Sequence, residues 1–105
     1  MRRVDIQWIR SQIGSGQYLW TLHADEERRN DGLEVVDVEV ALVEGMILES
    51  YPADPRGISC LVYGESKGRS IHVVCGKNQA ERLVIITVYK PTSPKWSTTK
   101  QRRTK

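Results

Sequence analysis

Three apolar runs lie close together in the middle of the sequence, and their spacing constrains the fold more than any other feature. The runs are Ile58–Tyr63, Ser70–Cys75 and Leu83–Tyr89, and they are rich in the β-branched residues that favour strands. Two short turn-forming segments, around Lys67-Gly68 and Gly76-Lys77-Asn78, separate them. Connections of this length cannot hold the crossover that parallel strands need. The runs therefore predict an antiparallel meander.

The N-terminal part of the chain predicts helices. Apolar residues recur at helical spacing over Val4–Ile13. A second helix is predicted to begin near Tyr18 and to stop at Asn30-Asp31-Gly32, which is a strong helix-end signal. The valines of Glu34–Glu44 fit both a strand and a helical stripe, and we favour a helix there.

Met46–Tyr51 predicts a first strand, which Pro52 and Pro55 end because proline cannot donate to a sheet ladder. Helices followed by strands indicate an α+β domain, with two to three N-terminal helices packed on one face of a four-stranded antiparallel sheet. A chain of 105 residues suffices for one such core. We expect a single domain over residues 1–96 and a basic, disordered tail over residues 97–105.

The distribution of charge suggests a partner. Residues 1–44 carry five Lys or Arg against nine Asp or Glu, whereas residues 45–105 carry eleven against four. A basic half of this kind suits a polyanion such as RNA, although a solvated basic tail explains the charge of the last residues equally well. No apolar run reaches the roughly 20 residues of a membrane helix, and polar residues interrupt the N-terminus, which argues against a signal peptide. We expect a cytoplasmic protein.

The two cysteines, Cys60 and Cys75, fit the same compartment. If the first two runs form a hairpin about Glu65–Gly68, Cys60 lies opposite Val73 and Cys75 lies opposite Ile58. The sulfurs are then diagonal neighbours, a poor fit to disulfide geometry, and we expect reduced, buried thiols. Neither cysteine belongs to a motif with metal-ligand spacing, so we expect no metal and no cofactor.

Side-chain alternation in this register assigns each strand residue to a face. The face that the helices cover is expected to hold Ile58, Cys60, Val62, Ile71, Val73, Cys75, Val84, Ile86 and Val88. The opposite, mixed face is expected to hold Ser59, Leu61, Tyr63, His72, Val74, Leu83, Ile85, Thr87 and Tyr89.

The polar residues of the mixed face suit cleavage of RNA by its own 2′-hydroxyl, which needs an acid, a base and cations but no metal. His72 is the candidate acid or base, because imidazole titrates near neutral pH. Arg56 and Lys90, at strand ends, are candidates to hold phosphate. Tyr63 and Tyr89 are candidates to stack a base or donate a proton. Each of these side chains alone also fits an ordinary packing role.

His23 lies on the second predicted helix. It either makes a structural hydrogen bond between helix and sheet or reaches the edge of the sheet and joins the site. His23 and His72 could form a pair of metal ligands, but the sequence has no third ligand at a spacing that is typical of metal sites.

The chain also resembles a known family, over roughly residues 20–96. The motifs that carry the resemblance are Leu22-His23-Ala24-Asp25-Glu26-Glu27-Arg28-Arg29-Asn30-Asp31-Gly32-Leu33, Val40–Gly45, Tyr51-Pro52-x-Asp54-Pro55-Arg56-Gly57, Ser59–Val62, His72–Gly76 and Ile85–Tyr89 with Pro91. They are similar to a bacterial and archaeal domain of unknown function, whose genes often lie beside small zinc-finger antitoxins with CxxC motifs.

The resemblance implies the toxin of a type II toxin–antitoxin pair on a barnase/RelE-like ribonuclease fold, with RNA and a zinc-finger or helix-turn-helix antitoxin as partners. By analogy it adds Ser59 and His23 to the candidate residues, beside Arg56, His72 and Tyr89. Thr87, from the mixed face, completes the expected substrate contacts. The function expected is therefore a metal-independent endoribonuclease resembling mRNA interferases. A non-catalytic RNA-binding or protein-binding module and a purely structural interaction domain are the alternatives.

Overall fold

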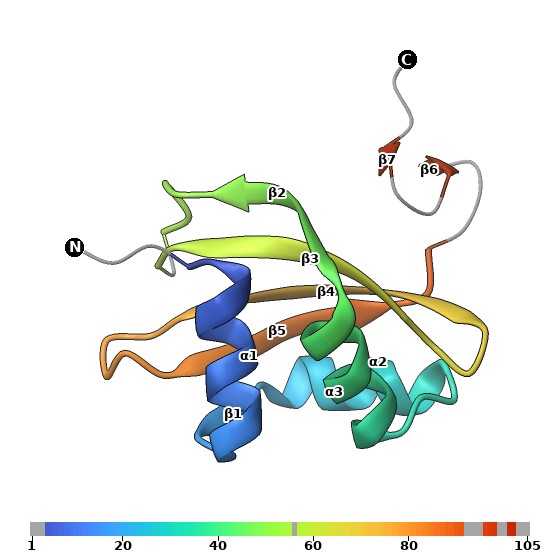
Figure 1. Cartoon of the computed structure of the whole chain (residues 1–105), viewed down its shortest axis with the longest axis horizontal. Coiled ribbons are helices and arrows are strands. Elements are labelled where there is room, and N and C mark those ends of the chain that lie inside the picture. The colour runs from blue at the N-terminus through green and yellow to red at the C-terminus, as the bar shows by residue number, and fades with distance from the viewer. Residues whose placement is uncertain (1–3, 56, 92–95, 99–100, 103–105) are drawn as a thin grey trace.

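The computed structural model describes residues 4–55, 57–91, 96–98 and 101–102. Within these ranges the chain is α+β, with three helices and a five-stranded mixed sheet of strand order β1-β5-β4-β3-β2 (Figure 1). A separate pair of short strands, β6 (Trp96–Thr98) and β7 (Gln101–Arg102), follows the sheet in sequence. The α+β class predicted from the order of helices and strands is confirmed.

The meander forms as predicted. Its strands are β2 (Met46–Tyr51), β3 (Ser59–Ser66), β4 (Arg69–Lys77) and β5 (Leu83–Tyr89), and each pairs antiparallel with the next. The β3–β4 turn has only two central residues, Lys67-Gly68, and both have positive φ, 55° and 77°. Such a turn matches the twist of the flanking strands and fixes their register.

A fifth strand lies where the sequence predicted the start of a helix. β1 (Tyr18–Trp20) pairs parallel with the outer edge of β5. It lies between α1 (Ile6–Ser15) and α2 (Leu22–Asn30), because Gly16 ends α1 at a φ of 74° and the Thr21 side chain caps α2. The prediction of a sheet with four antiparallel strands is therefore wrong, because the sheet has this fifth, parallel strand at its edge.

The third helix, α3 (Val35–Glu44), settles the ambiguity of the valine-rich segment in favour of a helix. A capping box decides it: the Glu34 side chain accepts from the backbone at position 37, and the Asp37 carboxylate accepts from the backbone N–H of Glu34 at 2.9 Å. Ser66 donates to Asp37 at 2.7 Å and Arg69 at 3.0 Å, so the β3–β4 turn is bonded to the start of α3.

The register corrects two predictions about the faces. Cys60 pairs directly with Cys75, not with Val73, because the two-residue turn shifts the pairing by two residues and leaves each strand's alternation unchanged. On β5 a bulge intervenes: Val74 pairs with Thr87 and Cys75 pairs with Ile85, which skips one residue of β5.

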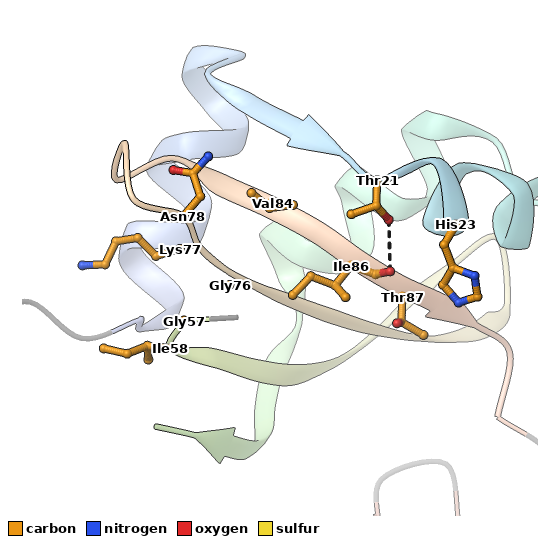
Figure 2. Close-up of a pocket in the computed structure, with 10 residues that line it drawn as sticks. All are labelled: Thr21, His23, Gly57, Ile58, Gly76, Lys77, Asn78, Val84, Ile86 and Thr87. Atoms are coloured by element: carbon orange, nitrogen blue, oxygen red, sulfur yellow. Dashed lines mark hydrogen bonds between the residues drawn. The ribbon is translucent and has the colours of Figure 1, made fainter. Parts of the chain in front are cut away.

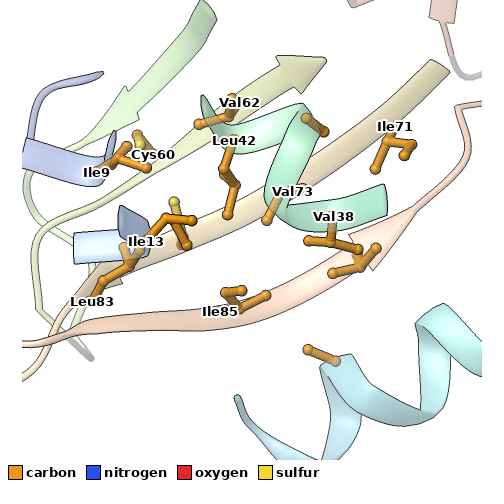
Figure 3. Packing of buried hydrophobic residues seen from close by; sticks show 14 of the residues in the cluster. Ile9, Ile13, Val38, Leu42, Cys60, Val62, Ile71, Val73, Leu83 and Ile85 are labelled. Carbon is orange, nitrogen blue, oxygen red and sulfur yellow. The ribbon is translucent and has the colours of Figure 1, made fainter. Parts of the chain in front are cut away.

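The bulge exchanges the faces of four β5 residues relative to the prediction. Leu83 and Ile85 belong to the buried cluster beneath the helices, whereas Val84 and Ile86 are half-buried and line a groove (Figures 2 and 3). Beyond the bulge the alternation is restored, so that Val88 is in the core as predicted.

Both cysteines are buried, free thiols, as predicted, but the predicted reason was wrong. The Cys60–Cys75 pair is two residues from the Ile58–Lys77 pair, where the Lys77 N–H donates to the Ile58 carbonyl at 3.0 Å. Pairs alternate along an antiparallel ladder, so the cysteines form a hydrogen-bonded pair, where opposed Cβ atoms are about 5.5 Å apart. A disulfide needs about 3.5–4.5 Å between them.

The core fills the space between the sheet and the helices (Figure 3). α2 packs against β5, α3 packs against β3 and β4, and α1 packs against α3. The fully buried side chains in it include Ile9, Val38, Leu42, Val62, Ile71, Val73, Leu83 and Ile85. Among the described residues, no helix is long and apolar enough to cross a membrane.

Candidate functional site

Three predicted site residues form a row across neighbouring strands, on the face opposite the hydrophobic cluster. Tyr63 pairs with His72, and His72 pairs with Tyr89. The rings of Tyr63 and His72 have centroids 6.0 Å apart, and those of His72 and Tyr89 are 5.3 Å apart, both edge to face. The His72 Nδ1 lies 3.3 Å from the Tyr89 hydroxyl. The prediction that these three residues share one face of the sheet is confirmed.

The centre of this row is not accessible to solvent, as an active site would need to be. His72 has no exposed surface and Tyr63 is 6% exposed. An imidazole that solvent cannot reach cannot exchange protons with an RNA backbone in this conformation. The geometry of the row therefore suits a buried polar network, and we refer to it as the Tyr63–His72–Tyr89 row.

A groove of about 490 Å³ lies beside β5, and its size falls in the range of small-molecule sites. Val84 and Ile86 line it because the bulge turns them away from the core. Its remaining lining residues are Thr21, His23, Gly57, Ile58, Gly76, Lys77, Asn78 and Thr87. His23 lies at one end and Asn78 at the other, with Val84 and Ile86 between them (Figure 2).

The groove brings two predicted residues together, His23 and Thr87. The His23 side chain is 67% exposed, and its Nε2 lies 3.3 Å from the Glu27 carboxylate, one helical turn along α2. The other oxygen of Glu27 accepts a hydrogen bond of 2.9 Å from the backbone N–H of Val88. Glu27 is thereby held to the sheet and can orient the imidazole at the mouth of the groove.

The start of α2 adds to the electrostatics of the groove. Thr21, another lining residue, caps the helix by accepting from the Ala24 N–H at 3.0 Å, and donates to the Ile86 carbonyl at 3.1 Å. These bonds fix the helix N-terminus against β5. The N-terminus of a helix carries a partial positive charge that favours an anion nearby.

Two more predicted residues, Ser59 and Lys90, lie apart from the groove. Ser59 is buried and donates to Asp54 at 2.8 Å, which stabilises the turn after β2. Lys90 is exposed just after β5, and its backbone N–H donates to Asp31 at 3.1 Å. Arg56 lies outside the described residues.

Sequence reasoning missed the groove and the role of Glu27. The groove depends on the bulge, which strict alternation cannot show. Glu27 had a readable signal, because His23 and Glu27 are four residues apart on a helix and such residues share a face. Among the described residues, no cluster of three or more His, Cys, Asp or Glu side chains could hold a metal ion.

Comparison with known protein families gives a match. A family model described as a domain of unknown function (DUF4258) matches residues 20–90. This range contains the His23–Glu27 pair, the groove and the Tyr63–His72–Tyr89 row. No curated protein and no solved structure matches the chain.

Proposed function

This chain belongs to the DUF4258 family of domains of unknown function, and from that premise we propose that it is a metal-independent endoribonuclease of the toxin type. One observation carries the proposal: an exposed imidazole, oriented by an anchored carboxylate, lies at the mouth of a groove on the sheet. Of the three predicted catalytic residues, His23 is the exposed one, so the proposal gives it the acid–base role.

The chemistry follows from the His23–Glu27 contact. The Glu27 carboxylate accepts a hydrogen bond from the Nε2–H group of His23, which leaves Nδ1 as the basic nitrogen. In the proposed reaction Nδ1 removes the proton of a ribose 2′-hydroxyl, and the 2′-oxygen forms a bond to the adjacent phosphorus. The bond from phosphorus to the 5′-oxygen breaks, and that oxygen takes up a proton from the imidazolium or through water. The products are a 2′,3′-cyclic phosphate and a 5′-hydroxyl end.

Charge near the groove supports binding of the phosphate. The N-terminus of α2 carries a partial positive charge, and its capping residue Thr21 lines the groove. The order of helices before an antiparallel meander is also that of the barnase/RelE-like fold, which favours this reaction class by analogy. We extend the analogy to a cognate zinc-finger or helix-turn-helix antitoxin as the partner.

The Tyr63–His72–Tyr89 row is the second candidate centre. The Tyr89 hydroxyl lies 3.3 Å from Nδ1, just beyond the roughly 2.6–3.2 Å at which a proton is transferred directly. This candidate requires a movement that uncovers His72, so we place it second.

A cleavage assay with purified protein and end-labelled RNA, in the presence of EDTA, tests the proposal. Wild type is expected to shorten the RNA and to leave cyclic phosphate ends. His23→Ala is expected to lower the rate at least about 100-fold, the usual contribution of a general base. The matched control is Glu26→Gln, an exposed neighbour on α2, which should cleave like wild type.

Each outcome is decisive. Salt-sensitive RNA binding without cleavage would replace the nuclease by the non-catalytic RNA-binding module. Cleavage that survives His23→Ala and is lost in folded His72→Ala would move the site to the buried row. Induction in a bacterium adds a cellular readout, because wild type should arrest growth and His23→Ala should not.

A further inference from the structure

The end of the groove opposite His23 has a chemistry of its own. Asn78 begins the β4–β5 loop, and its side-chain oxygen accepts two backbone hydrogen bonds, from Ala80 at 2.9 Å and from Arg82 at 3.0 Å. The backbone N–H of Asn78 in turn donates to the Arg82 carbonyl at 3.0 Å. This loop therefore determines which end of the amide is oxygen.

The consequence is that the Asn78 NH2 group is the end left for a ligand. Asn78 lines the groove, and its Nδ2 makes no hydrogen bond within the part of the chain that the structure describes. An amide nitrogen donates two hydrogen bonds and accepts none. This end of the groove thus offers donors to the acceptor groups of a ligand.

The floor between Asn78 and His23 is apolar. Val84 and Ile86 form it, and Gly76 lies beside them on β4. A Cβ at Gly76 would meet the Ile58 carbonyl oxygen at 2.7 Å, so the backbones approach closely there. From Val84 to Thr87 the strand advances about 10 Å at roughly 3.3 Å per residue, which sets the length of the aliphatic floor.

We propose that this groove is a nucleobase pocket: one unstacked base lies on Val84 and Ile86, and the Asn78 NH2 group reads its acceptor edge. Guanine presents two adjacent acceptors, O6 and N7, whereas adenine presents an amino donor beside N7. The donor end at Asn78 therefore selects guanine over adenine. The inference rests on the proposed function, since it places the scissile phosphate of the same nucleotide toward His23, but its test is a binding measurement that needs no cleavage.

The test titrates the protein with guanosine 3′-monophosphate and with adenosine 3′-monophosphate, followed by calorimetry or NMR. Wild type is expected to bind the guanine nucleotide about 10-fold more tightly, in line with the discrimination of one good hydrogen-bonded pair. Val84→Trp fills the floor of the groove and should abolish binding of both nucleotides.

Asn78→Asp is the informative variant. A carboxylate keeps the oxygen that caps the loop and replaces the NH2 donor with an acceptor, so the preference for guanine should disappear or reverse. Gln79→Glu is the matched control, because it adds the same charge at the next, exposed position and keeps the amide at position 78. Its guanine-to-adenine ratio should equal that of wild type.

Failure here is distinguishable from failure of the nuclease proposal. Equal binding of both nucleotides, or a ratio that Asn78→Asp leaves unchanged, overturns the base pocket even if RNA is cleaved. Selective guanine binding without RNA cleavage supports the pocket and removes the nuclease assignment.

Discussion

The two histidines of this chain occupy opposite kinds of environment. His72 lies in the middle of the sheet, between two tyrosine rings and without exposed surface, whereas His23 lies on a helix with two thirds of its side chain exposed. Both contact a group that can orient an imidazole, the Tyr89 hydroxyl in one case and the Glu27 carboxylate in the other. The difference shows that convergence of suitable side chains does not define a site, because a substrate must also reach them.

The comparison leads to opposite expectations for substitution. Under the proposed function, changes in the buried row should act first on stability, and changes at the groove should act first on cleavage. The largest loss of stability is expected where a substitution removes a buried charge, and Asp37 is such a charge.

Asp37→Ala should cause the largest loss of stability, about 3–5 kcal/mol, because it leaves the charge of Arg69 and the bond of Ser66 without their partner. The hydrogen bonds from the Glu34 backbone and from Ser66, with the nearby Lys67 and Arg69 charges, lower the pKa of Asp37 from its usual 3.8. A group whose pKa is lowered by folding stabilises the folded state at pH values above its pKa in the unfolded chain. This stabilisation is lost as the pH falls through its pKa in the folded protein. Urea unfolding should therefore show the difference between wild type and variant at neutral pH, and the difference should shrink in acid.

An unchanged free energy of unfolding for Asp37→Ala at neutral pH would contradict the role of this network. Glu34→Gln is a milder companion, since the Asp37 carboxylate still accepts from the backbone N–H at position 34.

His72→Ala should cost about 3 kcal/mol, because it removes a fully buried ring from between two others. Folded protein at low temperature should still cleave RNA at nearly the wild-type rate. Thermal unfolding and the cleavage assay, run on the same sample, separate the two effects. Loss of cleavage in a fully folded sample would mean that the row, not the groove, is the catalytic centre.

Parts of this architecture were predictable and others were not, for physical reasons. The meander follows from short connections and β-branched runs, and strict alternation placed Tyr63, His72 and Tyr89 on one face. The three-residue strand Tyr18–Trp20 was not predicted, because its pairing partner, β5, lies more than sixty residues away in the sequence. The bulge could not be predicted because it depends on tertiary contacts and not on a local sequence pattern. The groove could not be predicted because it depends on the bulge.

Burial was the other property that the pattern could not give. Alternation assigns His72 to a face, but it does not say whether that face is open at that position. The exposure of His23 was equally undetermined, since a histidine on a charged helix fits either a structural contact or an open site.

Glu27→Gln sharpens the comparison from the groove side. The Gln oxygen can still accept from the Val88 N–H, but its NH2 group cannot accept a hydrogen bond from the imidazole N–H, so His23 loses its orientation. The cleavage rate should fall roughly 10-fold to 100-fold, through kcat and not KM. Thermal stability should change little, whereas a purely structural role would lower stability and leave kcat intact.

Tyr89→Phe carries the smallest expected effect and tests the row without emptying it. The variant keeps the ring that packs on His72 and removes the hydroxyl 3.3 Å from Nδ1, which should cost about 1 kcal/mol of stability. Cleavage should stay at the wild-type rate, because under the proposed function the row only supports the sheet beside the groove. If instead kcat falls 100-fold with no change in unfolding, the hydroxyl takes part in proton transfer, and the buried histidine, not the exposed one, performs the chemistry.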